Sequence, residues 1–234
     1  MNEIEHKNFV KKKFDLIVKK YDLVNLIGSL GQDYLWRKKV ALVLKKTPTP
    51  ILDLCCGPFT LSLALLKERP CPIFALDFSL EMLFYGKTKL SEKEKYFIYP
   101  VCADAEILPF KSETFGTLSI AFGLRNLSNK EKALEEFYRV LKPEGVLAIL
   151  EFSLPKVFIF KKIYLFYLTK YLPFLGKLLT GDKEAYQYLA ESIQKFPPPE
   201  ELKKTLLKIG FKEVIYEYFT LGIVTFYLAI KGKS

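Results

Sequence analysis

The sequence is poor in the residues that build metal and disulfide sites. His6 is the only histidine, and the four cysteines have neither zinc-site nor disulfide-framework spacing; two of them, Cys55 and Cys56, are adjacent. We therefore expect no metal site and reduced cysteines within a core, as in cytoplasmic proteins. No apolar segment follows the start of the chain, so a signal peptide is not expected either.

Long apolar runs without charge are also missing. The most apolar stretch, 154–179, contains five lysines and Pro173, which argue against a bilayer span. Lysines interleaved with aromatic residues instead predict amphipathic helices that cover an active site or lie on a membrane. The net charge of +10 permits nucleic-acid binding. The lysines are nevertheless spread along the chain, and we expect no nucleic-acid partner.

The chain does contain enough apolar sequence for a large core, since half of its 234 residues are hydrophobic. Its length predicts a single domain over 1–234. Helical spacing of apolar residues predicts an N-terminal helical extension over 1–48, frayed over 1–8 and closed by prolines. Its second helix is expected over 33–45, with Leu35, Trp36, Val40 and Val43 facing inward.

Residues 51–60 predict the start of a nucleotide-binding βαβ unit. An apolar run typical of a buried parallel strand ends at Gly57-Pro58, and a leucine-rich helix over 61–66 follows. This arrangement brings backbone N–H groups and a helix N-terminus close to a ligand. Asp53 lies inside the strand, where a carboxylate is costly to bury unless it is paired.

Acidic residues also end the next two predicted strands. Asp77, in strand 72–78, follows the glycine turn by about 20 residues, where Rossmann-like folds place an acid on ribose hydroxyls. Asp104 follows the strand over 96–102. Either acid alone is readily explained as a helix cap or a solvated loop residue. Three acids in consecutive strands favour a nucleoside site at the carboxyl edge of the sheet.

The remaining elements complete a seven-stranded α/β sheet. Strands are expected over 115–122 and 146–152, and an antiparallel hairpin over 213–219 and 222–231. A helix is predicted over 79–90, with Ser79 as its N-cap, and another over 129–141, with a capping box formed by Ser128 and Glu131. Asp182 is expected to cap a helix that runs to about 194, and a last helix is predicted over 199–209, with Gly210 as its C-cap. A mostly parallel sheet that ends in such a hairpin, with one glycine in its first turn, favours a class I methyltransferase fold over a dehydrogenase.

Several segments between Phe14 and Lys231 resemble the ubiquinone/menaquinone biosynthesis C-methyltransferases (the UbiE/MenG family). Segment 21–36 resembles the family's N-terminal signature, and 139–153 resembles its second signature. The Gly-Leu-Arg-Asn sequence at 123–126 is the most specific match, and 188–197 completes it. The resemblance implies a Rossmann-like methyltransferase with an N-terminal helical cap and an inserted helical segment over 154–195.

The family's activity, as implied by the resemblance, is carbon methylation of a polyprenylated quinol with S-adenosylmethionine (SAM) as cofactor. The expected substrate is demethylmenaquinol, and a ubiquinone-branch benzoquinol is the alternative. The expected location is the cytoplasm, in peripheral contact with the inner face of the cell membrane, and a homodimer is left open.

The resemblance and the edge acids together assign the site residues. Cofactor-binding residues are expected to be Asp53, Gly57, Pro58, Asp77, Phe78, Asp104, Ala105 and Ala121. Substrate-binding residues are expected to be Tyr21, Asn25, Arg125 and Asn126, and catalytic residues Arg125, Asn126 and Asp22. Arg125 would stabilise the quinolate and Asn126 would orient a ring hydroxyl, while a water held by Asp22 and Arg125 is the candidate base. A salt bridge at a helix start is the alternative role for Arg125.

The sequence also departs from the family pattern. Gly57-Pro58-Phe59 stands where Gly-Thr-Gly or Gly-Thr-Ala is common, which removes a hydroxyl and would place the bulk of Phe59 beside the cofactor. Asp33 replaces a usual histidine, and Glu144 a usual glycine. Two alternative functions therefore stay open: methylation of RNA or another small molecule, and a SAM-fold protein without catalysis.

Overall fold

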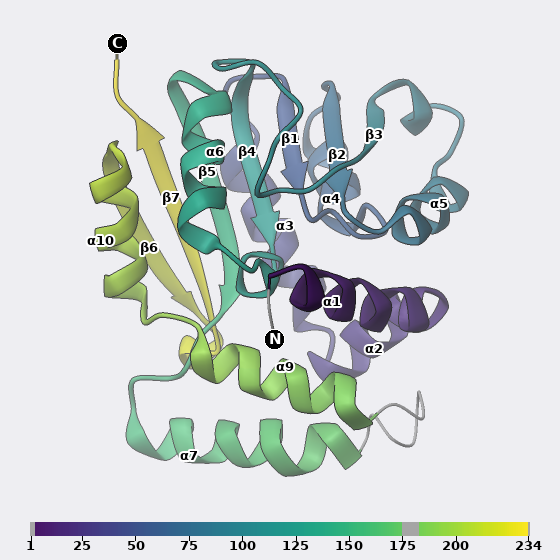
Figure 1. The fold of residues 1–234 in the computed structure, drawn as a ribbon, viewed down its shortest axis with the longest axis vertical. Coiled ribbons are helices and arrows are strands. Elements are labelled where there is room, and N and C mark those ends of the chain that lie inside the picture. The colour runs from purple at the N-terminus through teal and green to yellow at the C-terminus, as the bar shows by residue number, and fades with distance from the viewer. Residues whose placement is uncertain (1–2, 175–182, 234) are drawn as a thin grey trace.

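The structure, a computed structural model, describes residues 3–174 and 183–233. Its centre is a seven-stranded sheet with the order β3-β2-β1-β4-β5-β7-β6 (Figure 1). The strands are β1 (Ile51–Leu54), β2 (Ile73–Asp77), β3 (Ile98–Cys102), β4 (Phe115–Ala121), β5 (Leu141–Phe152), β6 (Phe211–Phe219) and β7 (Val224–Lys231). All neighbours are parallel except β7, which runs antiparallel to β5 and β6. The predicted sheet is confirmed.

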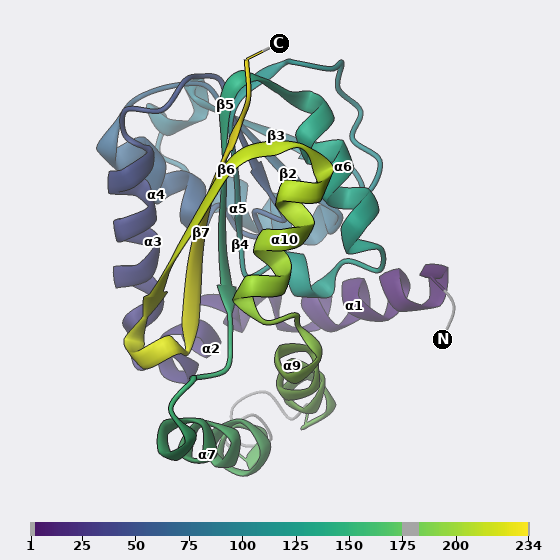
Figure 2. The ribbon, with the colours of Figure 1, turned by 90° about the vertical axis from the view of Figure 1, so that its left-hand side faces the viewer.

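Helices cover both faces of this sheet (Figure 2). The helices are α1 (Glu3–Ile17), α2 (Tyr21–Gly28), α3 (Gln32–Leu44), α4 (Thr60–Glu68), α5 (Leu80–Lys89), α6 (Lys130–Val140), α7 (Phe158–Phe166), α9 (Lys183–Lys195) and α10 (Pro199–Ile209). Apolar side chains of α3, α4 and α5 form one core with the sheet, and those of α6 and α10 form a second core on the other face. Burial of these two layers is the main stabilising term.

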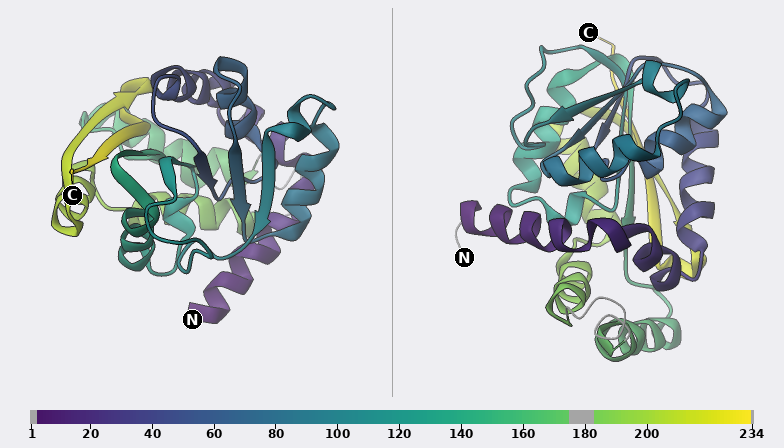
Figure 3. Two further views of the ribbon diagram at one scale, coloured as in Figure 1. Left: turned by 90° about the horizontal axis from the view of Figure 1, so that it is seen from above. Right: turned by 90° about the vertical axis from the view of Figure 1, so that its right-hand side faces the viewer.

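Among the described helices, α1, α2, α7 and α9 gather at the carboxyl edge of the parallel strands. Figures 1 and 3 show α1 lying across this edge with α2 beside it, and Figure 1 shows α7 and α9 below it. Helix α7 continues into a π-helical turn over Tyr167–Tyr171. Tyr164, Leu168 and Leu172 on this segment pack against α9, which gives the edge a small apolar core of its own. Helices α1, α2, α7 and α9 therefore cover the carboxyl edge of the sheet.

Several local expectations are wrong at this edge. Residues 3–8 are helical rather than frayed, because ion pairs from Lys7 to acidic residues fix the start of α1. On α3, Leu35 and Val43 are exposed, and the buried face is made by Trp36, Arg37, Val40, Ala41 and Leu44. Strand β1 ends two residues early because Cys55 has a left-handed backbone, with φ of 50°.

Helix caps also differ in part from expectation. Ser79 caps α5 as predicted, accepting the Met82 N–H at 3.1 Å. Helix α6 is capped by Asn129, which accepts the Lys132 N–H at 3.0 Å, whereas the Ser128 N–H donates to Glu106. The expected cap at Asp182 lies outside the described residues.

Candidate functional site

A cavity of about 100 Å³ lies where β1, β2 and β4 end, beneath α1; we call it the cofactor cavity. Six of the predicted cofactor-binding residues line it: Gly57, Asp77, Phe78, Asp104, Ala105 and Ala121. They come together because parallel strands deliver their carboxyl ends to one edge of the sheet. Lys7 and Lys11 of α1 close the cavity from the other side.

Asp77 is the best-defined acceptor in the cofactor cavity. Its Oδ2 accepts the Gly57 N–H at 2.8 Å, and its Oδ1 accepts the Ser79 N–H at 2.8 Å. Burial raises the pKa of Asp77 to about 6, against the lowering effect of these two bonds, and the negative charges of Asp53 and Asp15 raise it further. A carboxylate has about four lone-pair positions, so acceptor capacity remains for ligand hydroxyls.

Three neighbouring residues lie outside this cavity. Asp53 is buried beneath it and accepts the hydroxyls of Ser62 at 2.6 Å and Ser119 at 2.7 Å, while burial raises its pKa. Pro58 is buried and does not line the cavity, and Phe59 is 0% exposed. The expectation that Phe59 adds bulk beside the cofactor is wrong, because its ring fills a space against Gly86 in the core.

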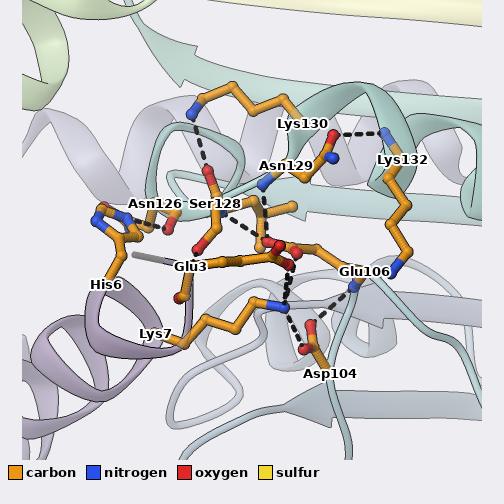
Figure 4. A network of polar contacts seen from close by, with 11 residues as sticks. Glu3, His6, Lys7, Asp104, Glu106, Asn126, Ser128, Asn129, Lys130 and Lys132 are labelled. Carbon is orange, nitrogen blue, oxygen red and sulfur yellow. Dashed lines mark hydrogen bonds and ion pairs between the residues drawn. The ribbon is translucent and has the colours of Figure 1, made fainter. Parts of the chain in front are cut away.

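Helix α1 is fastened over the cofactor cavity by a polar network (Figure 4). Lys7 Nζ lies 2.8 Å from Asp104 Oδ2, 2.7 Å from Glu106 Oε2 and 3.0 Å from Glu3 Oε1. Burial opposes the charge on Lys7, but the carboxylates hold its pKa above the ordinary value. Glu106 is fully buried, and its Oε1 also accepts the backbone N–H of Ser128 at 2.6 Å. Sequence reasoning missed Lys7, since nothing local to 1–8 marks a contact with residues 104–106.

A second, larger cavity of about 410 Å³ adjoins the first; we call it the acceptor cavity. Its lining is mainly apolar and comes from α1, α2, α3, the α7 segment, α9 and the loop before β7. Phe14, Tyr21 and Phe122 line both cavities, so these three residues mark the junction between them. The volume is that of a site for an organic molecule of moderate size.

Arg125 lies on the wall of the acceptor cavity and is also paired. Its Nη1 lies 2.9 Å from Glu151 Oε1 and also donates to the Phe122 carbonyl, and its backbone N–H donates to Glu151 Oε2 at 3.1 Å. Glu151 is 1% exposed. Among the described residues, the buried Nε of Arg125 has no hydrogen-bond partner. The salt bridge expected as the alternative is therefore present, and one donor nitrogen still lacks a protein partner.

The other predicted acceptor-site residues are divided between three places. Tyr21 and Asn25 line the acceptor cavity. Asn126 lines the cofactor cavity instead, where its Oδ1 accepts the Tyr188 hydroxyl at 3.2 Å. Asp22 lines neither cavity, because its half-exposed carboxylate is bonded to Lys89 of α5. The structure thus does not bring Asp22 and Arg125 together around a water.

Sequence reasoning also missed an ion pair on α3. Asp33 and Arg37 both line the acceptor cavity, with Arg37 Nε 3.0 Å from Asp33 Oδ1. The spacing of the two residues, four apart on a predicted helix, was the available signal.

Across 3–174 and 183–233, no group of three or more His, Cys, Asp and Glu residues is placed to hold a metal ion. Within these ranges, no helix combines the length and the apolar character needed to cross a bilayer.

The sheet order and the acids at its carboxyl edge define the class I methyltransferase fold. Solved structures similar to the chain include a SAM-dependent methyltransferase from Thermotoga maritima, described as a possible histamine N-methyltransferase. That structure aligns with a TM-score of 0.66 at 19% identity, over 94% of this chain and 99% of its own. A phosphoethanolamine N-methyltransferase from Haemonchus contortus with bound S-adenosylhomocysteine aligns with a TM-score of 0.60 at 14% identity, over 80% of this chain and 50% of its own.

The chain belongs to the ubiE/COQ5 methyltransferase family, whose model matches residues 1–231. A demethylmenaquinone methyltransferase from Thermus thermophilus is 41% identical over 92% of this chain and 98% of the relative. A ubiquinone/menaquinone biosynthesis C-methyltransferase from Geotalea daltonii is 37% identical over 95% and 96%, respectively. The predicted family is confirmed, and with it the enzyme class, a SAM-dependent methyltransferase.

Proposed function

We propose that the protein transfers a methyl group from SAM to a ring carbon of a polyprenyl quinol, converting demethylmenaquinol to menaquinol. The observation that carries this proposal is the junction of the two cavities at Phe14, Tyr21 and Phe122. On one side lie carboxylates suited to a nucleoside, and on the other a mainly apolar cavity with guanidinium groups in its wall. The names of the relatives support demethylmenaquinol as the acceptor.

The polar groups of the cofactor cavity suit the ribose and adenine of SAM. The Asp77 carboxylate has acceptor capacity for ribose hydroxyls, and Asp104 would accept from the adenine amino group in exchange for its contact with Lys7. When bound, SAM supplies an electrophilic methyl group on its sulfonium sulfur. The protein's task is then to hold the acceptor ring at the junction, where orientation alone can supply roughly 7–11 kcal/mol.

The acceptor cavity holds a positive charge, that of Arg125, which can stabilise the negative charge of a deprotonated quinol. A ring carbon becomes nucleophilic when the neighbouring quinol oxygen loses its proton, and Arg125, in the wall of this cavity, would stabilise the resulting negative charge. After the transfer, the methylated ring carbon loses its proton and the ring oxygen takes one up, which restores the aromatic quinol. Tyr21, at the junction, is kept in its neutral phenol form, because burial raises its pKa.

The substrate is tested by methyl transfer from labelled SAM to two quinols side by side under reducing, anaerobic conditions. We expect demethylmenaquinol to be methylated at least tenfold faster than a demethoxy-ubiquinol, because the lining favours the larger apolar ring. Equal or reversed rates would overturn the choice of branch. Methylation of total tRNA, with neither quinol accepted, would contradict the proposed function.

We further infer that the protein works in the cytoplasm at the inner face of the cell membrane, through the outer face of α7. Phe158, Ile159, Ile163 and Phe166 are each at least 61% exposed. Three exposed lysines lie on the same segment: Lys161, Lys162 and Lys170. Ile163 also lines the acceptor cavity, as do Leu30 and Leu221, which are 81% and 66% exposed. An apolar cavity that opens among exposed apolar residues suits the passage of a polyprenyl tail from a bilayer.

Replacing Phe158 and Phe166 together by serine is expected to reduce binding to anionic liposomes about tenfold or more, since each buried side chain contributes roughly 1.5–3 kcal/mol. Co-sedimentation measures this, and added salt should weaken wild-type binding because the lysines are screened. Tyr96→Ser is the control, because the Tyr96 side chain is as exposed as that of Phe158 but lies before β3, away from α7. Wild-type protein that stays in the supernatant would overturn the membrane contact and leave this face as a lid or a dimer contact. Dimers that are lost in the double variant would assign it to a dimer contact.

A further inference from the structure

Asp33 and Arg37 form a buried ion pair in the wall of the acceptor cavity. Arg37 Nε lies 3.0 Å from Asp33 Oδ1 and 3.1 Å from Oδ2, so a single donor serves both carboxylate oxygens. The side chain of Arg37 is 5% exposed and that of Asp33 is 14% exposed. Burial lowers the pKa of Arg37, but its interactions, above all that with the negative charge of Asp33, together more than offset this and raise the pKa of Arg37 above its ordinary value. The guanidinium is therefore a permanent cation.

The terminal nitrogens of Arg37 are left available to a ligand. In the described part of the chain, no hydrogen bond joins Nη1 or Nη2 to another residue, while Nε is fully used by Asp33. The guanidinium lies over the ring of Phe122, 5.1 Å from its centroid, and both side chains line the acceptor cavity. These terminal donors lie in the wall of a mainly apolar cavity, where an oxygen of a bound ligand can accept from them.

Phe122 contacts both Arg37 and Arg125. Its carbonyl accepts from Arg125 Nη1, and its ring lies 4.5 Å from that of Phe152, over which Arg125 is placed. Phe122 also has a left-handed backbone with φ of 61°, a conformation that is strained for a phenylalanine and concentrates at functional sites. Each of the two cations therefore lies over one ring of this aromatic pair in the wall of the acceptor cavity.

We propose that Arg37 binds the second oxygen of the quinol, the one that does not lie at Arg125, and that Asp33 is a positioning residue acting through Nε. This inference rests on the proposed function and extends it to substrate selection. A 1,4-diol carries oxygens at opposite sides of its ring, so it can engage both cations at once. A ring with one oxygen can engage only one of them, and binds more weakly.

The test compares naphthalene-1,4-diol with 1-naphthol, which lacks the second oxygen, by calorimetric titration without cofactor under reducing conditions. Wild-type protein should prefer the diol about tenfold, the effect of one hydrogen bond to a charged donor. In Arg37→Gln this preference should fall below twofold, with little change in affinity for 1-naphthol. Arg37→Lys should retain part of the preference, and Asp33→Asn should weaken it because Arg37 is no longer held. Arg139→Gln is the matched control, since Arg139 pairs with Glu136 on α6 and lines neither cavity.

The outcomes separate this inference from the proposed function. A folded Arg37→Gln that keeps the tenfold preference overturns the inference, as does a wild type without preference; the proposed function survives either result if demethylmenaquinol is still methylated. If neither Arg37 variant folds, the pair is structural and the inference is wrong. A protein that methylates no quinol fails the proposed function itself.

Discussion

Replacing Arg125 by lysine is expected to lower the rate of quinol methylation about a hundredfold, the usual effect of losing one preorganised donor at a developing negative charge. Lysine keeps the charge and can still pair with Glu151, but an ammonium cannot reproduce the planar guanidinium that also reaches the Phe122 carbonyl. SAM affinity should change less than twofold, because Arg125 lines the acceptor cavity and not the cofactor cavity.

Three readouts decide between catalysis and structure at Arg125. Turnover is measured at saturating quinol, SAM binding by calorimetry, and stability by thermal unfolding. Arg139→Lys, on α6, is the control and should keep wild-type turnover. If Arg125→Lys unfolds or loses SAM binding, its pair with Glu151 is structural and the mechanism proposed for it is wrong.

Replacing Asp77 by alanine is expected to weaken SAM binding at least tenfold, because a hydrogen bond to a charged acceptor contributes about 1.5–3 kcal/mol. The binding of SAM should also depend on pH. Burial raises the pKa of Asp77 to about 6, so the carboxylate gains a proton as the pH falls through 6 and loses acceptor capacity. Affinity should therefore be constant above pH 7 and fall about tenfold by pH 5.

Calorimetric titrations between pH 5 and pH 8 check both effects. Asp77→Asn removes the titrating group and should flatten this part of the profile. Asp104→Asn is the matched variant, since it alters the other acid of the cavity and should leave the midpoint near pH 6 in place. A wild-type affinity that is unchanged at pH 5 would remove Asp77 from the binding of SAM.

The fold was largely predictable because the sequence patterns that indicate it are local and recur at each strand. Apolar runs of strand length, each ended by a turn, predicted all seven strands, and the acids at their ends predicted the edge where Asp77 and Asp104 lie. Parallel strands bring such residues together without any need to know the loops. The same rule could not say that Asp53 points beneath the cavity rather than into it.

The side-chain contacts at the site were not predictable, because they join segments that lie far apart in the sequence. Lys7 meets Asp104 across 97 positions, and no pattern around either residue indicates this contact. The left-handed backbone of Phe59 turns its ring into the core, which a motif comparison of the glycine turn cannot show. The pairing of Asp22 with Lys89 likewise follows from the packing of α2 near α5 and not from the signature that contains Asp22.

The reaction proposed for this protein is the transfer of a methyl group to a ring carbon of a quinol. Its most direct test is NMR of the product formed from demethylmenaquinol and SAM carrying a ¹³C-labelled methyl group. We expect a single carbon signal in the range of an aryl methyl group, with the proton of the methylated ring carbon lost. A signal in the range of a methoxy carbon, or no labelled quinol, would contradict it.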